Sequence, residues 1–186
     1  CTAGGGCPGG VKVNYGSTGG RNACVASTSS VTGTYQASTG QTSCNSAGNG
    51  VYVASAGATG TTACTAGNYC PSGKIVGCPT ADSGWTKTSP ASSSAVTQCY
   101  EYQTPTNCAS GSVKRQGTTS NNYSSTIELN SRLYAKANYY TTSTATSCSA
   151  CPTNYGTSDA NSSSGASACY LTTSSGKFVK TANQAE

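Results

Sequence analysis

The stretch CTAGNYCPSG at residues 64–73 places two cysteines six positions apart in a segment of Gly, Ala, Ser, Thr and Pro. A near copy, CTAGGGCPGG, occupies residues 1–10, and CASG at 108–111 repeats the opening phrase a third time. Polar, Gly-rich surroundings of this kind are typical of turns held by disulfides, because they contain too few apolar side chains to form a core. The phrase is therefore best interpreted as the start of a small disulfide-bonded repeat.

Each copy of the phrase opens a set of four cysteines, and the three sets account for all twelve in the chain. The sets are Cys1, Cys7, Cys24 and Cys44; Cys64, Cys70, Cys78 and Cys99; and Cys108, Cys148, Cys151 and Cys169. This phasing predicts three tandem four-cysteine modules, at residues 1–63, 64–107 and 108–186. Chance similarity of Ser- and Thr-rich sequence is the alternative.

The ends of the chain fit the same repeat. A Gly-x-aromatic-Val phrase precedes CTAG inside the chain at Gly50–Val53, and it recurs near the C-terminus at Gly176–Val179. We therefore expect the 186 residues to be one period of a longer polypeptide in which modules follow one another head to tail. The alternative is that Cys1 is the lipidated N-terminus of a mature lipoprotein.

Composition indicates what must hold the modules together. Leu, Ile, Val and Phe supply roughly a tenth of the residues, below the ~20 % under which disorder is expected. Ordering the backbone costs ~1–2 kcal/mol per residue, whereas a disulfide that closes a loop of ~15–20 residues contributes about 3 kcal/mol. All twelve cysteines are thus predicted to be disulfide-bonded, in an oxidising extracellular or cell-surface compartment.

Short strands separated by Gly turns are expected at 10–15 (GVKVNY), 50–55 (GVYVAS) and 176–181 (GKFVKT). The third module also contains an insertion at about 111–147. Within it, apolar residues recur with a period of two, which predicts a strand with one apolar face. These residues are Ile127, Leu129, Leu133, Ala135, Ala137 and Tyr139. A short helix over 127–138 and a flexible loop are the alternatives. The predicted fold is small, disulfide-rich, mostly β and loop, with three tandem modules forming an elongated rod.

The module pattern of CPxG or CPT, a Gly/Ser/Thr-rich loop and a closing cysteine resembles the cysteine-rich repeats of ephrin-receptor-like and tumour-necrosis-factor-receptor-like proteins. It is also similar to long bacterial tandem-repeat surface proteins with CTAGxYCPGG-like phrases. The resemblance covers the chain except roughly 111–147. It implies the pairs Cys151–Cys169 and Cys78–Cys99. Cys24–Cys44 follows less directly, because in the first module Cys7, and not Cys24, carries the CPGG phrase. From the sequence alone, four cysteines allow three pairings in each module.

Several classes of chemistry are not expected. The chain has no His to activate a nucleophile, and its five acidic residues lie far apart. The only CxxC is Cys148–Cys151, too little for a zinc site. The +5 net charge comes from scattered residues, which does not favour nucleic-acid binding, and no stretch approaches the ~20 apolar residues of a membrane span. We therefore predict no enzyme activity, no cofactor and no metal.

The leading functional interpretation is a structural repeat unit of an extracellular filament or surface fibre, with other copies of the chain as partners through head-to-tail, lateral or helical assembly. Candidate assembly contacts are Ile127, Leu129, Leu133, Tyr139 and Tyr140. The alternative is an adhesin or receptor-like module that binds a host glycan or protein. Asn122 (NYS) and Asn161 (NSS) match the N-glycosylation sequence.

Overall fold

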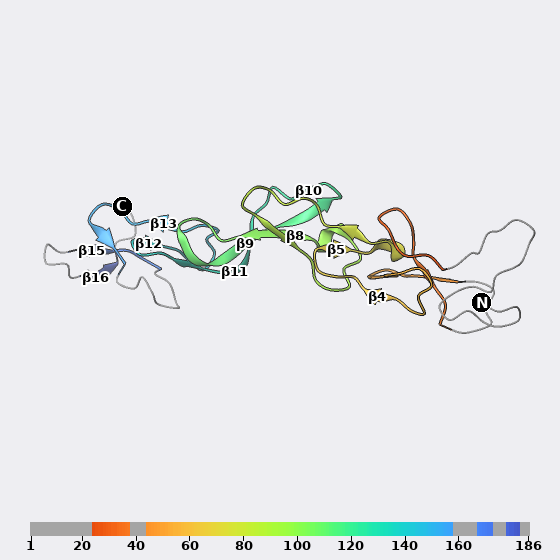
Figure 1. Ribbon diagram of the computed structural model, residues 1–186. Helices are drawn as coiled ribbons and strands as arrows, with labels where there is room; N and C mark the ends of the chain where they lie inside the picture. The colour runs from red at the N-terminus through yellow and green to blue at the C-terminus, as the bar shows by residue number, and fades with distance from the viewer. Residues whose placement is uncertain (1–23, 38–43, 158–166, 173–177, 183–186) are drawn as a thin grey trace, which may run out of the picture. The chain divides into compact units, whose positions relative to one another are not determined.

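The computed structural model describes residues 24–37, 44–157, 167–172 and 178–182, which consist of strands, turns and loops with two short 3-10 helices (Figure 1). Five disulfides join cysteines within this part of the chain. A disulfide-rich, mostly β and loop fold is therefore confirmed. The strand expected at 10–15 lies outside the described residues.

The chain divides into two compact units. Unit 1 takes in the described residues up to Ala81, together with Lys87–Tyr100 and Gln116–Tyr123; unit 2 takes in Asp82–Thr86, Glu101–Arg115 and the described residues from Ser124 onward. These boundaries differ from those predicted for the cysteine modules. Each of the five disulfides nevertheless lies within a single predicted module and within a single unit.

Unit 1 contains short antiparallel pairs of two-residue strands. They are β1 (Thr34–Tyr35) with β2 (Asn45–Ser46), β3 (Val51–Tyr52) with β4 (Thr62–Ala63), and β5 (Asn68–Tyr69) with β6 (Val76–Gly77). The expected strand over 50–55 is thus shortened to β3, because Gly50 at its start has a φ of 74° and forms a turn. The 3-10 helices η1 (Pro71–Gly73) and η2 (Val96–Gln98) complete the unit, and η1 begins at a proline, whose fixed φ suits a first helical position.

A larger sheet has the strand order β10-β9-β8-β7, with β11 also paired to β9. Its strands are β7 (Thr86–Thr88), β8 (Tyr100–Gln103), β9 (Cys108–Thr119), β10 (Asn122–Tyr123) and β11 (Glu128–Ala135). The strand predicted from Ile127 to Tyr139 is confirmed only in part: β11 ends at Ala135, Ala137 is exposed in a turn, and Tyr139 begins β12. The alternatives of a helix over 127–138 and of a flexible loop are wrong, because this segment pairs in antiparallel register with β9.

The β9–β11 pair is irregular in register. Leu129 lies opposite Val113, Ser131 opposite Ser112, and Tyr134 opposite Ser110. From Ser131 to Tyr134, β11 advances three residues while β9 advances two, as in a β-bulge. The apolar residues Leu129, Leu133 and Ala135 nevertheless keep a period of two, whereas Ser131 between them is exposed.

The rest of unit 2 consists of short strands in two small sheets. One pairs β12 (Tyr139–Tyr140) with β13 (Ser149–Ala150), and the other has the order β14 (Tyr155–Gly156), β15 (Tyr170–Thr172) and β16 (Phe178–Ala182). The strand expected at 176–181 overlaps β16. In both sheets the paired strands are antiparallel.

Among the described residues, two small buried clusters take the place of a continuous core. In unit 2, partly buried Trp85, Leu129 and Tyr139 pack around a buried set; its members are Cys108, Val113, Leu133, Ala135 and Cys148. In unit 1, Val76, Val96 and Tyr123 pack around the second set; its members are Tyr69, Cys78 and Cys99. Both clusters include half-cystines, so the disulfides lie where these units have their interior.

Hydrogen bonds cross the boundary between the first and second predicted modules. We call this set, which lies within unit 1, the first junction. Its backbone bonds are Gly50 N to Cys70 O (2.9 Å), Cys64 N to Gly50 O (2.9 Å), Gly33 N to Gly73 O (3.0 Å) and Ile75 N to Thr28 O (3.1 Å). Side chains add Ser72 N to Asn49 Oδ1 (2.7 Å), Thr32 Oγ1 to Ser72 O (2.9 Å) and Ser27 Oγ to Gly73 O (2.7 Å). The first two modules therefore meet through paired backbone, without a free linker.

The boundary between the second and third predicted modules is crossed in the same way. We call these bonds the second junction, and each lies within one unit. In unit 2 they are Lys136 N to Asn107 O (3.3 Å), Lys136 Nζ to Thr106 O (2.6 Å) and Thr104 Oγ1 to Gly111 O (2.7 Å). In unit 1 they are Gly117 N to Cys99 O (2.8 Å) and Tyr123 Oη to Pro79 O (2.9 Å). Successive modules are therefore joined on both sides of residues 64–107.

Candidate functional site: the disulfides and the Arg115 cluster

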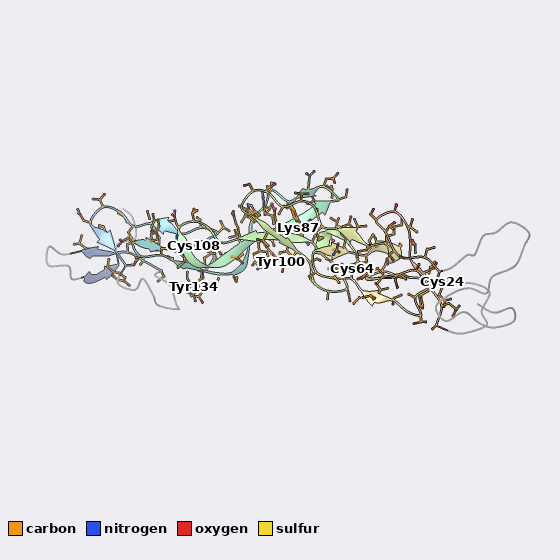
Figure 2. All side chains as sticks on the ribbon, viewed as in Figure 1. Cys24, Cys64, Lys87, Tyr100, Cys108 and Tyr134 are labelled. Carbon is orange, nitrogen blue, oxygen red and sulfur yellow. A yellow bond between two sulfur atoms is a disulfide. The ribbon has the colours of Figure 1, made fainter. Side chains whose placement is uncertain are left out.

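Each described cysteine forms a disulfide with the cysteine that comes directly before or after it among the cysteines of the sequence. The bonds are Cys24–Cys44, Cys64–Cys70, Cys78–Cys99, Cys108–Cys148 and Cys151–Cys169, with sequence separations of 20, 6, 21, 40 and 18. Figure 2 labels Cys24, Cys64 and Cys108, each of which belongs to a different one of these bonds. Three of the five bonds are the pairs that the resemblance implied. No described cysteine is free, and Cys1 and Cys7 lie outside the described residues.

Half-cystines also supply much of the buried apolar surface. Among the described residues, eight of the fifteen buried apolar side chains are half-cystines. Cys24, Cys64, Cys70 and Cys99 are fully buried, at 0 % exposure. Loops of about 20 residues closed in this way contribute about 3 kcal/mol each to stability by restricting the unfolded chain. The sulfur bridges thus act both as cross-links and as the interior of the units.

A cluster of ion pairs lies in unit 2, formed by Asp82, Glu101, Arg115 and Trp85, of which only Glu101 is fully buried. Glu101, the second residue of β8, has 0 % exposure, and its Oε2 accepts a hydrogen bond from the backbone N of Asp82 at 2.8 Å. The guanidinium of Arg115, in β9, contacts the carboxylates of both Asp82 and Glu101. Its Cζ also lies 4.3 Å from the centroid of the Trp85 ring, within the range of a cation–π interaction.

This cluster balances a carboxylate that would otherwise be costly to bury. An isolated buried charge is strongly unfavourable, whereas a paired and hydrogen-bonded one is tolerated. The pairing is incomplete, because Glu101 Oε1 contacts Arg115 Nη2 as an ion pair without hydrogen-bond geometry, and Arg115 Nε has no hydrogen-bond partner. Since Glu101 is fully enclosed, its carboxylate is not placed to meet a substrate. The cluster therefore acts as a structural clamp between β8 and β9.

Sequence reasoning missed this cluster. Asp82, Glu101 and Arg115 are separated by 19, 14 and 33 positions, and nothing in their local patterns indicates that they meet. The alternation Tyr-Glu-Tyr-Gln at 100–103 would place Glu101 with Gln103 on the polar face of a strand, so the local pattern gives no signal that Glu101 is buried.

The predicted assembly contacts do not form one surface. Leu133 is only 2 % exposed and belongs to the core of unit 2, so its assignment as an assembly contact is corrected. Leu129 and Tyr139 are partly buried against the same core, and Tyr140 is half-buried in β12. Ile127, at 43 % exposure, is the one member of the set with a largely accessible side chain. Leu133 lies at the same period of two as Leu129 and Ala135, and these side chains pack into the core of unit 2.

The two predicted glycosylation sequences have different positions. Asn122 is exposed at the start of β10, whereas Asn161 lies outside the described residues. Within the described part of the chain, no group of three or more His, Cys, Asp or Glu side chains could hold a metal ion. None of the helices among these residues has the length and apolar character needed to cross a membrane.

No family model, curated protein or solved structure matches this chain. Its function must therefore be inferred from the cross-links, the clusters and the junctions themselves.

Proposed function

We propose that this chain is a structural repeat unit of an extracellular filament or surface fibre, one period of a longer tandem-repeat polypeptide stabilised by disulfides. The observation that carries the proposal is the combination of local cross-links with hydrogen-bonded junctions. Every described disulfide closes a loop inside one predicted module, while the junctions bond successive modules through backbone and side-chain groups. In tandem arrays, stability is a sum of terms from each repeat and from its contacts with immediate neighbours.

This combination suits a chain that bears load outside the cell. Disulfides are covalent and persist in oxidising surroundings, so a module closed by them keeps its loops together when it is pulled or when a protease opens it locally. The junctions add stiffness, because a paired backbone cannot bend as a free linker does. Five disulfides make an extracellular location consistent with the structure, and the partners we propose are other copies of the chain, in head-to-tail, lateral or helical assembly.

The proposal is tested by imaging the material from which the native protein is recovered. An antibody raised against this chain should decorate filaments in electron micrographs, and a three-dimensional reconstruction should show a repeat that accommodates this sequence in consecutive copies. Decoration of isolated particles that carry no repeat, together with binding of the purified chain to a glycan array, would contradict the proposal and favour an adhesin.

A further inference from the structure

A glycosylation sequence lies on an exposed edge of unit 1. Asn122, Tyr123 and Ser124 form the Asn-x-Ser acceptor sequence. Asn122 begins β10, which is the last strand in the order β10-β9-β8-β7, and it is paired with Thr119 across the turn formed by Ser120 and Asn121. Asn122 is exposed, as are both residues of the turn. A large substituent on this residue therefore meets solvent and not a neighbouring strand.

Asn122 and the next residue, Tyr123, differ in exposure. Tyr123 is half-buried against the core of unit 1, and its hydroxyl donates a hydrogen bond to the Pro79 carbonyl at 2.9 Å. The register of β10 shifts between Asn122 and Tyr123, and Asn122 is exposed whereas Tyr123 is half-buried. The backbone carbonyl of Asn122 accepts a hydrogen bond from Thr118 Oγ1 at 3.2 Å. Its side-chain amide makes no hydrogen bond within the described residues, so substitution at Nδ2 breaks no protein contact.

We propose that Asn122 carries an N-linked glycan. The donor is an oligosaccharide linked to a polyprenyl pyrophosphate, the class of co-reactant used for glycosylation during secretion. A bond forms between Asn122 Nδ2 and C1 of the first sugar, and the bond between C1 and the pyrophosphate oxygen breaks. The pyrophosphate leaves with the electron pair, and the amide loses one proton to a base of the transferase.

The position of the glycan gives it a role at the sheet edge. An unpaired edge strand is a template for association with another strand, and bulky or charged groups at the edge prevent this. A glycan on β10 covers the edge beside the turn and leaves the disulfides and the junctions untouched. This inference is independent of the proposed fibre function, because assembly through the junctions does not require a sugar.

The test uses native protein and peptide mass spectrometry. Digestion with a peptide N-glycosidase in water labelled with oxygen-18 should convert Asn122 to a labelled Asp, and the untreated peptide should carry the mass of a glycan. Recovery of this peptide from untreated native protein only with an unmodified Asn122 overturns the proposal. The readout is specific to the peptide, so glycosylation at Asn161 cannot be mistaken for it.

Variants of the full chain, secreted from a host that performs N-glycosylation, provide the second arm. Asn122→Gln and Ser124→Ala should each remove one glycan from the protein, whereas Ser124→Thr should retain it, because threonine keeps the acceptor hydroxyl. Asn121→Gln is the matched control: it alters the neighbouring residue of the same turn, which is outside the acceptor sequence, and should retain the glycan. An unchanged mass for Asn122→Gln relative to the parent chain contradicts the proposal.

Discussion

Arg115 and Glu101 show how single residues stabilise a chain with so little apolar sequence. Glu101 is fully buried, and its carboxylate is balanced by the Arg115 guanidinium and by the backbone N of Asp82. Trp85 covers the guanidinium and also packs against the core of unit 2. Arg115 thus makes ion pairs, contacts an aromatic ring and links the neighbouring strands β8 and β9. Its loss should therefore lower the stability of unit 2.

We predict that Arg115→Met lowers the free energy of unfolding by about 3–5 kcal/mol, because it leaves the buried Glu101 carboxylate without a cation. The measurement is guanidinium-induced unfolding with the disulfides intact. Lys114→Met is the matched control: its ion pair with Glu128 spans 3.8 Å, and the Glu128 side chain is 57 % exposed. That variant should lose less than about 1 kcal/mol.

A double variant separates charge imbalance from loss of packing. Arg115→Met combined with Glu101→Leu removes both charges, and should recover most of the stability lost in Arg115→Met, since apolar replacement of a buried pair is often neutral. Equal losses for Arg115→Met and Lys114→Met would show that the cluster is not a clamp.

At the scale of the element, the first junction depends on Gly73, the last residue of η1. Gly73 has a φ of 70°, and a Cβ added to it would lie 2.5 Å from the carbonyl oxygen of Ala47. Its carbonyl accepts hydrogen bonds from Gly33 N at 3.0 Å and Ser27 Oγ at 2.7 Å. A side chain here would therefore both strain the backbone and press apart the two modules.

We predict that Gly73→Ala destabilises unit 1 by more than about 1 kcal/mol, because the native φ is unfavourable for alanine. Amide hydrogen exchange should accelerate at Gly33 and Ile75, whose N–H groups bond across the first junction. Gly60→Ala is the matched control, since a Cβ there meets no atom within 4 Å. Unchanged exchange at both amides in Gly73→Ala would show that the junction does not depend on this glycine.

The disulfides should contribute different amounts to the free energy of unfolding, because they close loops of different lengths. The Cys108–Cys148 bond has a sequence separation of 40 and the Cys64–Cys70 bond one of 6. Loop-closure entropy predicts a loss of about 4 kcal/mol for Cys108→Ala with Cys148→Ala, and of about 2 kcal/mol for Cys64→Ala with Cys70→Ala. Denaturant unfolding of the two double variants measures the difference. The reverse order would contradict an account based on restriction of the unfolded chain.

The sequence predicts the elements that composition and apolar periodicity determine, but not those that depend on neighbouring strands. Disulfide-rich β and loop structure follows from composition, because a chain with so few large apolar residues and twelve cysteines has few other ways to become ordered. The strand β11 could be recognised from its apolar period. Its bulges could not. Nor does the sequence show that the apolar face packs within unit 2, so Leu133 is predicted as an assembly contact but lies in the core. The long polar strand β9 was not predicted either, because its order comes from its neighbours β8, β10 and β11.

The candidate site was less predictable than the fold. The resemblance implied the Cys78–Cys99 and Cys151–Cys169 pairs, which the structure contains. The Arg115 cluster joins residues distant in sequence, and only the folded sheet brings them together. Half of the bonds named for the two junctions join backbone to backbone, and these leave little signal in side-chain identity apart from the glycines that permit close approach.

At the scale of the whole molecule, disulfide-closed loops recur along the described part of the chain. Small buried clusters, each containing half-cystines, replace one continuous core. Such a design can be extended by repetition, because each module needs only its own cross-links and its nearest neighbours. This is the physical basis of the proposed fibre, and it makes the oxidised state of the cysteines the condition on which shape depends.

Thermal unfolding of the native protein with and without a strong reductant tests this condition most directly. Circular dichroism should show a cooperative transition in the oxidised protein, and thiol titration should confirm that the reductant has opened the bridges. We predict that the fully reduced protein shows no such transition in the same temperature range and gives the spectrum of an unfolded chain. A fully reduced protein that keeps its spectrum and its melting temperature would contradict the claim that sulfur bridges, and not apolar packing, hold this fold.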